Sequence, residues 1–324
     1  MAIGKTSDFV IYSDEFFAGF FEGIVTNTAA FNEASRGALR LVPGAHEGHY
    51  QKESFLKRIA SFVTRRDITS VAAATDLAMT QGENVRVKIN RKIGPIAQTL
   101  DAWRKIGRDP STMSLILGQM VGQEVLEDYV RTAIKGVTAA IRANTAMVVA
   151  DTGAIITHAD LATGLSKFGD QAGKIVCWVM HSKPYFDLVK AQVTPATTIF
   201  EIGSLAVREG ITPLLGRPAI VVDAPDLTFV DTTTDYVTLG LTEDGVVVIE
   251  SEIREIVSDV VTGLENLVGR VQGEYAFTLG VKGFTWDVTN GGAGPTDAAI
   301  ATGTNWDQVA TDDKQTAGVG IHTQ

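Results

Sequence analysis

One stretch in the first half of the chain restricts the fold more than any other feature. From Met113 to Val149, apolar residues recur every three or four positions, which is the period of one face of a helix. Asp109 followed by Pro110 predicts the helix start, since aspartate is a good N-cap and proline suits the first turn. Such a helix of some 35 residues would be about 50 Å long. The sequence therefore predicts a protein built along a spine helix, whose recurring apolar positions are Ile116, Met120, Val121, Val125, Tyr129, Ala133, Val137, Ala140 and Ile141.

The composition indicates a globular protein with a substantial core. The chain has 324 residues, of which 45% are hydrophobic and 20% charged. This length allows two domains or one large, elongated one. Cys177 is the single cysteine, so no intrachain disulfide can form and a reducing compartment is expected. The N-terminus has no signal-peptide pattern, and the longest apolar runs are far below the roughly 18 to 20 residues that span a bilayer.

Charge is distributed unevenly along the chain. The net charge is -10, yet residues 51–108 hold 12 basic against 5 acidic residues, whereas residues 219–324 hold 4 against 17. Such segments are most often solvated faces. A second interpretation is that basic and acidic regions of neighbouring copies meet when the chain self-associates. Nucleic-acid binding fits poorly, because the sequence pI is about 5.0 and the acidic C-terminal third would repel phosphates.

The N-terminal residues 1–55 are expected to form an arm rather than a domain. Phe16, Phe17, Phe20 and Phe21 lie among small residues in a stretch that is too short to build its own core. We therefore expect these phenylalanines to be buried against something else, such as another subunit.

A basic hairpin is expected next, between residues 60 and 107. Val85, Val87 and Ile89 alternate with polar residues, two of which are Arg86 and Lys88, so one face of the strand is basic. A two-stranded hairpin is marginal in water on its own. Its basic face should contact another subunit, and reversing the charge of both Arg86 and Lys88 is expected to block assembly while leaving the fold intact.

The second half of the chain alternates helix and strand signals and predicts an α+β domain. Thr157 and Asp160 form a capping-box pattern, and Ser182 precedes a short helix. Strands are expected at 175–180 and 219–222. Asp244-Gly245 predicts a hairpin between strands 236–241 and 246–249. A long strand is expected over 268–288, followed from residue 290 by a tail that should be extended and poorly ordered unless a partner holds it.

Candidate catalytic and metal-binding groups do not form any recognised enzyme motif. His46 and His49 lack the spacing of a zinc helix, and the loop at 169–174 lacks one residue and the hydroxyl of a phosphate loop. Cys177 with His181 could form a thiol and base, and Asp223 with Asp226 could supply carboxylates after a strand. A buried cysteine and an ordinary turn are the more common explanations. We expect no cofactor and no metal site.

Three segments resemble a known family. The three segments are Ile175-Val-Cys-Trp-Val-Met-His-Ser-Lys-Pro-Tyr-Phe-Asp-Leu-Val, Leu215-Gly-Arg-Pro-Ala-Ile-Val-Val-Asp-Ala-Pro and the tail at 294–306. They are similar to segments of the major capsid protein of tailed bacteriophages, whose Hong Kong ninety-seven type fold is shared by encapsulins. The resemblance implies an α+β capsid fold with an N-terminal arm (1–55), an extended E-loop hairpin (56–107), a peripheral domain with the spine helix (108–152), an axial domain (153–267), a long peripheral strand (268–289) and a C-terminal tail (290–324).

The resemblance also implies a role and partners. The chain would be a structural, non-enzymatic protein whose hexamers and pentamers form a virion shell in the host bacterial cytoplasm. It would contact packaged double-stranded DNA weakly and meet separate scaffolding, portal and decoration proteins, with no membrane partner. Met1 lies almost at the arm, so scaffolding is expected to be a separate protein or absent. The residues expected at contacts between subunits are Phe16, Phe17, Phe20, Phe21, Arg86, Lys88, Arg91 and Lys92.

Two alternatives remain open from the sequence. An encapsulin-type cellular shell uses the same fold, and a soluble α/β enzyme could act through Asp223 or Cys177. Some family members cross-link lysine to asparagine, and Lys88, Lys92 and Lys282 are present here. The matching glutamate and asparagine context is missing, so we expect no such bond.

Overall fold

A computed structural model describes most of the chain. The described residues are 16, 18–20, 24–25, 27–44, 46–57, 63, 65–66, 68–71, 73, 78–99, 110–150, 153–191, 198–202, 205–208, 214–230, 234–251, 255–263 and 265–324. Phe17, Phe21 and the expected cap Asp109 lie outside this set.

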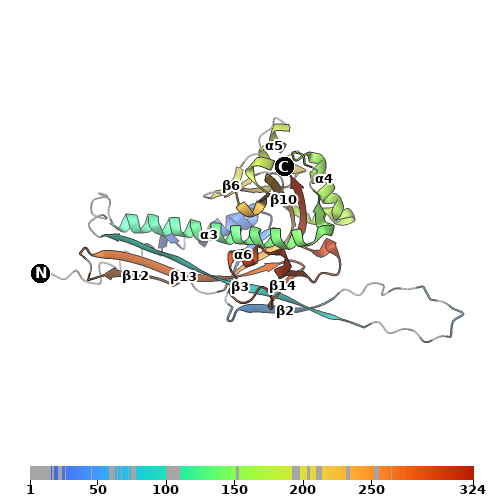
Figure 1. Cartoon of the computed structure of the whole chain (residues 1–324), viewed down its shortest axis with the longest axis horizontal. Coiled ribbons are helices and arrows are strands. Elements are labelled where there is room, and N and C mark those ends of the chain that lie inside the picture. The colour runs from blue at the N-terminus through green and yellow to red at the C-terminus, as the bar shows by residue number, and fades with distance from the viewer. Residues whose placement is uncertain are drawn as a thin grey trace.

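The predicted spine helix is confirmed as α3 (Pro110–Ala143), which has 34 residues. It ends six residues before the predicted Val149, because Asn144 leaves the helical conformation and its side chain caps a following turn by accepting the N–H of Ala146. Figure 1 shows α3 lying along the two longest strands, β3 (Gln81–Thr99) and β13 (Val268–Val281). The spine therefore sets the long axis of the molecule.

Two sheets flank α3 in the described part of the chain. The peripheral sheet has the order β1-β11-β13-β3-β2, with β12 paired to β13. Its remaining strands are β1 (Leu39–Pro43), β2 (Tyr50–Leu56), β11 (Val246–Glu250) and β12 (Glu255–Val261).

The axial sheet has the order β4-β16-β10-β5-β8-β7-β6, with β9 paired to β10. Its strands are β4 (Val148–Val149), β5 (Ile175–Met180), β6 (Thr198–Ile202), β7 (Leu205–Arg208), β8 (Ala219–Val222), β9 (Thr228–Val230), β10 (Thr234–Thr242) and β16 (Gly318–Thr323). The helices α4 (His158–Lys167) and α5 (Ser182–Ala191) bury Leu161, Tyr185 and Leu188 in a cluster with residues of this sheet. The expected capping box is present, since the Asp160 carboxylate accepts the backbone N–H of Thr157 at 2.7 Å.

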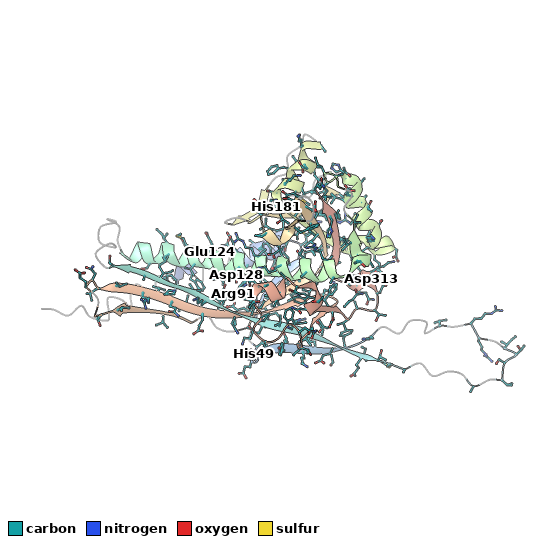
Figure 2. All side chains as sticks on the ribbon, in the orientation of Figure 1. His49, Arg91, Glu124, Asp128, His181 and Asp313 are labelled. Atoms are coloured by element: carbon teal, nitrogen blue, oxygen red, sulfur yellow. The ribbon has the colours of Figure 1, made fainter. Side chains whose placement is uncertain are left out.

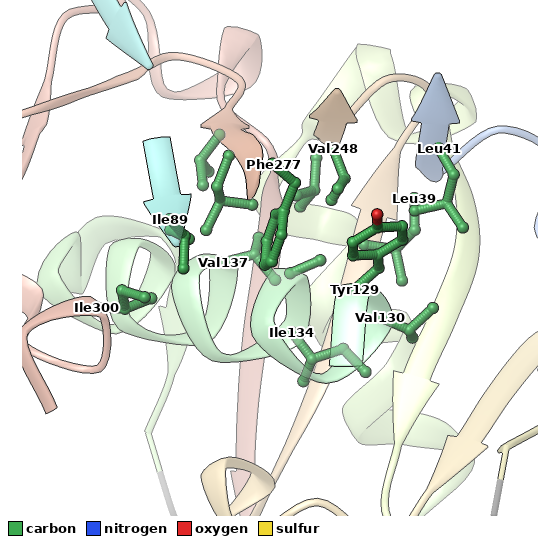
Figure 3. Close-up of a cluster of buried hydrophobic side chains, with 14 of the residues drawn as sticks. Leu39, Leu41, Ile89, Tyr129, Val130, Ile134, Val137, Val248, Phe277 and Ile300 are labelled. Carbon is green, nitrogen blue, oxygen red and sulfur yellow. The ribbon is translucent and has the colours of Figure 1, made fainter. Parts of the chain in front are cut away.

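One hydrophobic core joins the two sheets through α3. Val130, Ile134 and Val137 of the helix are fully buried, and Figure 3 shows this helical face packed against Phe277 of β13 and Ile89 of β3. The same cluster extends to Cys177 and Leu239 of the axial sheet. Both sheets therefore pack apolar side chains on one helix, and the axial sheet also forms a second buried cluster with α4 and α5.

The prediction of a β-hairpin at Asp244-Gly245 is wrong. The turn is present and Asp244 has a positive φ of 54°, but β10 belongs to the axial sheet whereas β11 belongs to the peripheral sheet. The turn therefore carries the chain from one sheet to the other. A turn motif fixes a change of chain direction and leaves open which strands pair.

The C-terminal tail also differs from expectation. β16 is a buried strand that pairs with β10 and β4 inside the axial sheet. Before it come α6 (Asp297–Ile300) and β15 (Trp306–Gln308), and β15 pairs with β14 (Phe284–Trp286). The rings of Trp306 and Trp286 pack edge to face, with their centroids 4.9 Å apart. The predicted long strand ends at Val281 because Gly283, with a φ of 80°, makes a turn before β14. This tail is held by its own chain.

We predict that Trp306→Ala lowers the free energy of unfolding by about 3–5 kcal/mol, the usual result of emptying a large buried aromatic site. Trp306 is 2% exposed and its indole N–H donates to the Ile300 carbonyl. Urea unfolding measures the change. Val288→Ala, at a residue that is 39% exposed, is the control and should stay within about 0.5 kcal/mol of wild type. Equal effects of the two changes would mean that the tail is not part of the cooperative fold.

Candidate interaction surfaces

A hairpin made by β2 and the first part of β3 leaves the body of the protein. Val87 pairs with Tyr50 on one side and Leu279 on the other, so at this position the hairpin is still part of the peripheral sheet. The N–H of Val85 donates to the Thr285 hydroxyl of β14 at 2.8 Å. From Asn84 outward, β3 pairs only with β2 within the described residues. Figure 1 shows the hairpin projecting at the end opposite the N-terminus.

Apolar side chains are exposed along this projection. We call the described residues between 55 and 81 the distal hairpin. Its exposed apolar residues and their exposed fractions are Phe55 37%, Leu56 57%, Val63 93%, Ile68 85%, Val71 103% and Met79 66%. Soluble monomers rarely leave apolar residues grouped on one projecting segment, and such groups mark interaction surfaces.

The phenylalanines of the arm lie within their own chain where the structure describes them. Phe16 and Phe20 are 5% and 0% exposed, and their rings stack with centroids 6.3 Å apart. The arm approaches α3 closely at Gly118, where a Cβ would collide with the Phe16 carbonyl oxygen. Their burial therefore needs no second subunit, which departs from the expectation for these two residues.

The basic residues expected on the hairpin surface also have partners in their own chain. Arg86 forms an ion pair with Glu53 of β2 at 2.9 Å. Lys88 is only 4% exposed, and its Nζ donates to the His46 carbonyl. A carboxylate at position 88 would be buried, so the expectation that reversing both charges leaves the fold intact is corrected. Lys92 is exposed.

Arg91 lies at the centre of a charged junction that the sequence analysis did not foresee. Its Nε donates to the Asp128 carboxylate of α3 at 3.2 Å, and its Nη2 lies 2.7 Å from the Asp297 carboxylate of α6. The Tyr275 hydroxyl of β13 donates to Asp128 at 2.7 Å. This Arg91 junction, whose centre is labelled in Figure 2, therefore ties together two strands, the spine helix and the tail.

The pKa shifts at the junction follow from burial and pairing. Burial acts to lower the pKa of Arg91, but the carboxylates of Asp128 and Asp297 outweigh it and the net shift is upward. Burial raises the pKa of the Tyr275 hydroxyl, and the adjacent Asp128 charge adds to this effect. The pKa of Asp297 is lowered, because Arg91 and Lys135 outweigh the opposing effect of burial. Arg91 and Asp297 are therefore charged at neutral pH, and Tyr275 is neutral.

Lys135 links the junction to the axial part of the chain. Its Nζ lies 3.4 Å from Asp297 and 3.8 Å from Asp226, which belongs to the short η4 turn (Pro225–Leu227). Asp226 was considered as a catalytic carboxylate from the sequence. Burial raises its pKa, and the structure gives it a bridging position between α3 and the axial sheet. No local pattern in the sequence indicates these contacts, because Arg91, Asp128 and Asp297 are far apart in sequence and follow no motif.

The other candidate catalytic groups are poorly placed for chemistry. Cys177 is fully buried, its thiol donates to the Trp178 carbonyl, and burial raises its pKa to about 12. The His181 Nε2 atom lies 3.4 Å from the Oδ1 atom of Asp223. The same oxygen accepts the backbone N–H of Ser182 and thus closes the turn before α5. The segment Gly169–Lys174 forms a 3-10 helix rather than a phosphate loop.

The two candidate metal-binding histidines, His46 and His49, directly precede β2. The His46 Nε2 atom lies 2.9 Å from the Tyr50 carbonyl oxygen, and His49, which is labelled in Figure 2, is exposed. Among the described residues, no group of three or more histidine, cysteine or acidic side chains could hold a metal ion. No helix among them is long and apolar enough to cross a membrane.

Comparisons with known proteins agree with one another. The family model of Gp13-like proteins, described as major capsid protein 13-like, matches residues 8–320. A chain from Microbacterium phage Oxtober96 has a TM-score of 0.52 at 11% identity, covering 90% of this chain and 91% of that one. A chain of the cyanophage Pam1 capsid asymmetric unit has a TM-score of 0.50 at 10% identity, covering 86% and 85%. No curated protein sequence matches.

We predict that Arg91→Gln lowers the free energy of unfolding by about 2–3 kcal/mol, because it leaves Asp128 without its cation and Asp297 with Lys135 alone. The control is Arg131→Gln, which removes the ion pair between Arg131 and Glu127 within α3, where the Arg131 side chain is 48% exposed. That change should cost at most about 1 kcal/mol. Urea unfolding at pH 7 measures both. A loss of equal size in the two variants would show that the junction contributes no more than a surface pair.

We also predict that Cys177 is unreactive in the folded chain, because its raised pKa and full burial keep the thiol protonated and inaccessible. Iodoacetamide labelling at pH 8, followed by mass spectrometry, should be slow in buffer. It should be fast in about 8 M urea, which unfolds the chain. Rapid labelling of the folded chain would return the thiol to consideration as a nucleophile.

Proposed function

The chain belongs to the Gp13-like family of major capsid proteins, and from this membership we propose that hexamers and pentamers of it form the icosahedral shell around the double-stranded DNA of a tailed bacteriophage. The family makes its role structural and places it in the virion capsid, where copies of the chain associate with one another. A family of capsid proteins favours this role over an encapsulin-type cellular shell and over an enzyme.

The exposed apolar side chains of the distal hairpin carry the proposal of contact between copies. A hairpin of two strands is marginal in water without a covering surface. Ile68 and Val71 are 85% and 103% exposed, so the chain alone does not cover them. A neighbouring copy lying under the hairpin would bury this surface and stabilise the hairpin at the same time. The distal hairpin is thus the segment that the single chain leaves incomplete.

Charge supports a second part of the proposal, that the shell holds its DNA weakly. The chain carries a net charge of -10, and every neutralised phosphate would add salt-dependent affinity that opposes DNA release. The basic residues Arg86, Lys88 and Arg91 already have partners in their own chain. We further propose that scaffolding, portal and decoration functions belong to separate proteins, and that assembly takes place in the host bacterial cytoplasm.

The test is assembly of the purified chain, followed by sedimentation velocity and negative-stain electron microscopy. We expect Ile68→Ser combined with Val71→Ser to raise the critical concentration for assembly at least about 10-fold, since each buried aliphatic side chain contributes about 1.5–3 kcal/mol. The thermal unfolding of the single chain should not change, because both side chains are exposed there.

The control variant changes two exposed polar positions on the same hairpin, Thr80→Ser and Gln81→Asn. It should assemble like wild type. Normal assembly of the Ile68 and Val71 double variant would contradict the proposed role of the hairpin. A wild-type chain that remains monomeric at every salt and protein concentration would contradict the proposal that its copies associate into hexamers and pentamers.

A further inference from the structure

A groove lies where the C-terminal half of α3 meets the axial part of the chain. It has a volume of about 510 Å³. One wall is a face of α3 with Lys135, Thr138 and Arg142, and the opposite walls are the η4 turn with Thr228 and the segment 301–304. The spacing of three and four residues places these three α3 side chains in one line along the groove. None of them figures among the contact residues expected from the sequence.

The two ends of this line differ in their charge balance. At one end, Lys135 faces the carboxylates of Asp226 and Asp297 at 3.8 and 3.4 Å. At the other end, two helical turns away, the guanidinium of Arg142 lies over the ring of Phe229 at 4.4 Å. Within the described residues no carboxylate lies within 4 Å of Arg142 to balance its charge. Arg142 as a residue is exposed, so a partner can reach it, and partial burial of its guanidinium lowers its pKa.

A second polar group on the same wall lacks a partner. Thr138 is 3% exposed, and its hydroxyl has no hydrogen-bond partner in the structure. It is four residues before Arg142, so the two side chains are neighbours on the helix surface. A buried hydroxyl without a partner costs about 1–3 kcal/mol, and an oxygen ligand that accepts from both groups would remove this cost.

We propose that this groove receives a carboxylate side chain from a neighbouring copy of the chain, with Arg142 and Thr138 as its donors. The inference rests on the proposed self-assembly. Carboxylates are in excess on every copy, since residues 219–324 alone hold 17 acidic against 4 basic residues. Asp226 also lines the groove and would repel a doubly charged phosphate more strongly than a singly charged carboxylate. A carboxylate is therefore the better match for the Arg142 end.

Cross-linking of mixed isotopic copies tests the proposal directly. Equal amounts of 14N- and 15N-labelled Arg142→Lys chains are allowed to associate and are treated with a carbodiimide, which joins an amine to an adjacent carboxylate without a spacer. We expect cross-links from position 142 that join a 14N peptide to a 15N aspartate or glutamate peptide. Links from Lys135 to Asp226 or Asp297 serve as the internal control and should join peptides of one isotope only.

Affinity provides the second measurement. Arg142→Gln should raise the critical concentration for assembly at least about 10-fold, as expected for the loss of a hydrogen bond to a charged group. It should leave the urea unfolding of the single chain unchanged. Arg131→Gln is the matched control on the same helix and should assemble like wild type.

The outcomes separate this inference from the proposed function. Shells that form normally from Arg142→Gln chains, or that show no mixed-isotope link at position 142 while the Lys135 links appear, would overturn the carboxylate contact alone. Protection of position 142 from modification by added duplex DNA, without mixed links, would assign the groove to phosphate and also overturn it. Wild-type chains that do not associate at all would overturn both proposals.

Discussion

The burial of one helix between two sheets is the constraint on which the remaining structure depends. Ile134 and Val137 of α3 are fully buried, and the cluster around them contains Phe277 of the peripheral sheet and Leu239 of the axial sheet. Each sheet covers an apolar face with the same helix, so neither can move away without exposing core side chains to water. A helix of 34 residues extends well beyond a compact core, and the long strands β3 and β13 accompany it for that reason. The elongated shape in Figure 1 follows from this shared packing.

Electrostatic contacts then fix how the peripheral elements meet this core. Arg91 joins β3 to α3 through Asp128 and to the tail through Asp297, while Lys135 extends the set to Asp226. Partly buried charges are stabilising when each has an opposite charge and hydrogen bonds, and they are costly when one partner is removed. The four segments that carry these charges, β3, α3, the tail and the η4 turn, must therefore reach their native positions together. The contrast with Arg142 is informative, because Lys135 of α3 has two carboxylate partners, whereas Arg142, two helical turns later, has an aromatic ring as its contact.

The sequence predicts the elements that depend on local patterns and misses those that depend on distant partners. The period of three and four locates α3, and Thr157 with Asp160 locates the start of α4, because both signals act within a few residues. Asp244-Gly245 marks a turn, yet nothing local reveals that β10 and β11 lie in different sheets. The glycine-rich tail looks disordered by composition, but β16 gains its order from β10, some eighty residues earlier. The Arg91 junction likewise depends on partners that are distant in sequence. The basic residues alone predict a contact with a neighbouring copy instead.

The arm and the hairpin differ in a way that bears on how such a chain begins to assemble. Phe20 is fully buried against its own chain, whereas Ile68 and Val71 are almost fully exposed. The arm can therefore dock before any neighbour arrives, since its apolar side chains already have a covering surface. From Asn84 outward, the strands that lead to the distal hairpin pair only with each other within the described residues, and a two-stranded pairing is marginal in water. Under the proposed self-assembly, a second copy would bury these exposed side chains and stabilise the hairpin in one step, so that the stability of each subunit would depend on its neighbour.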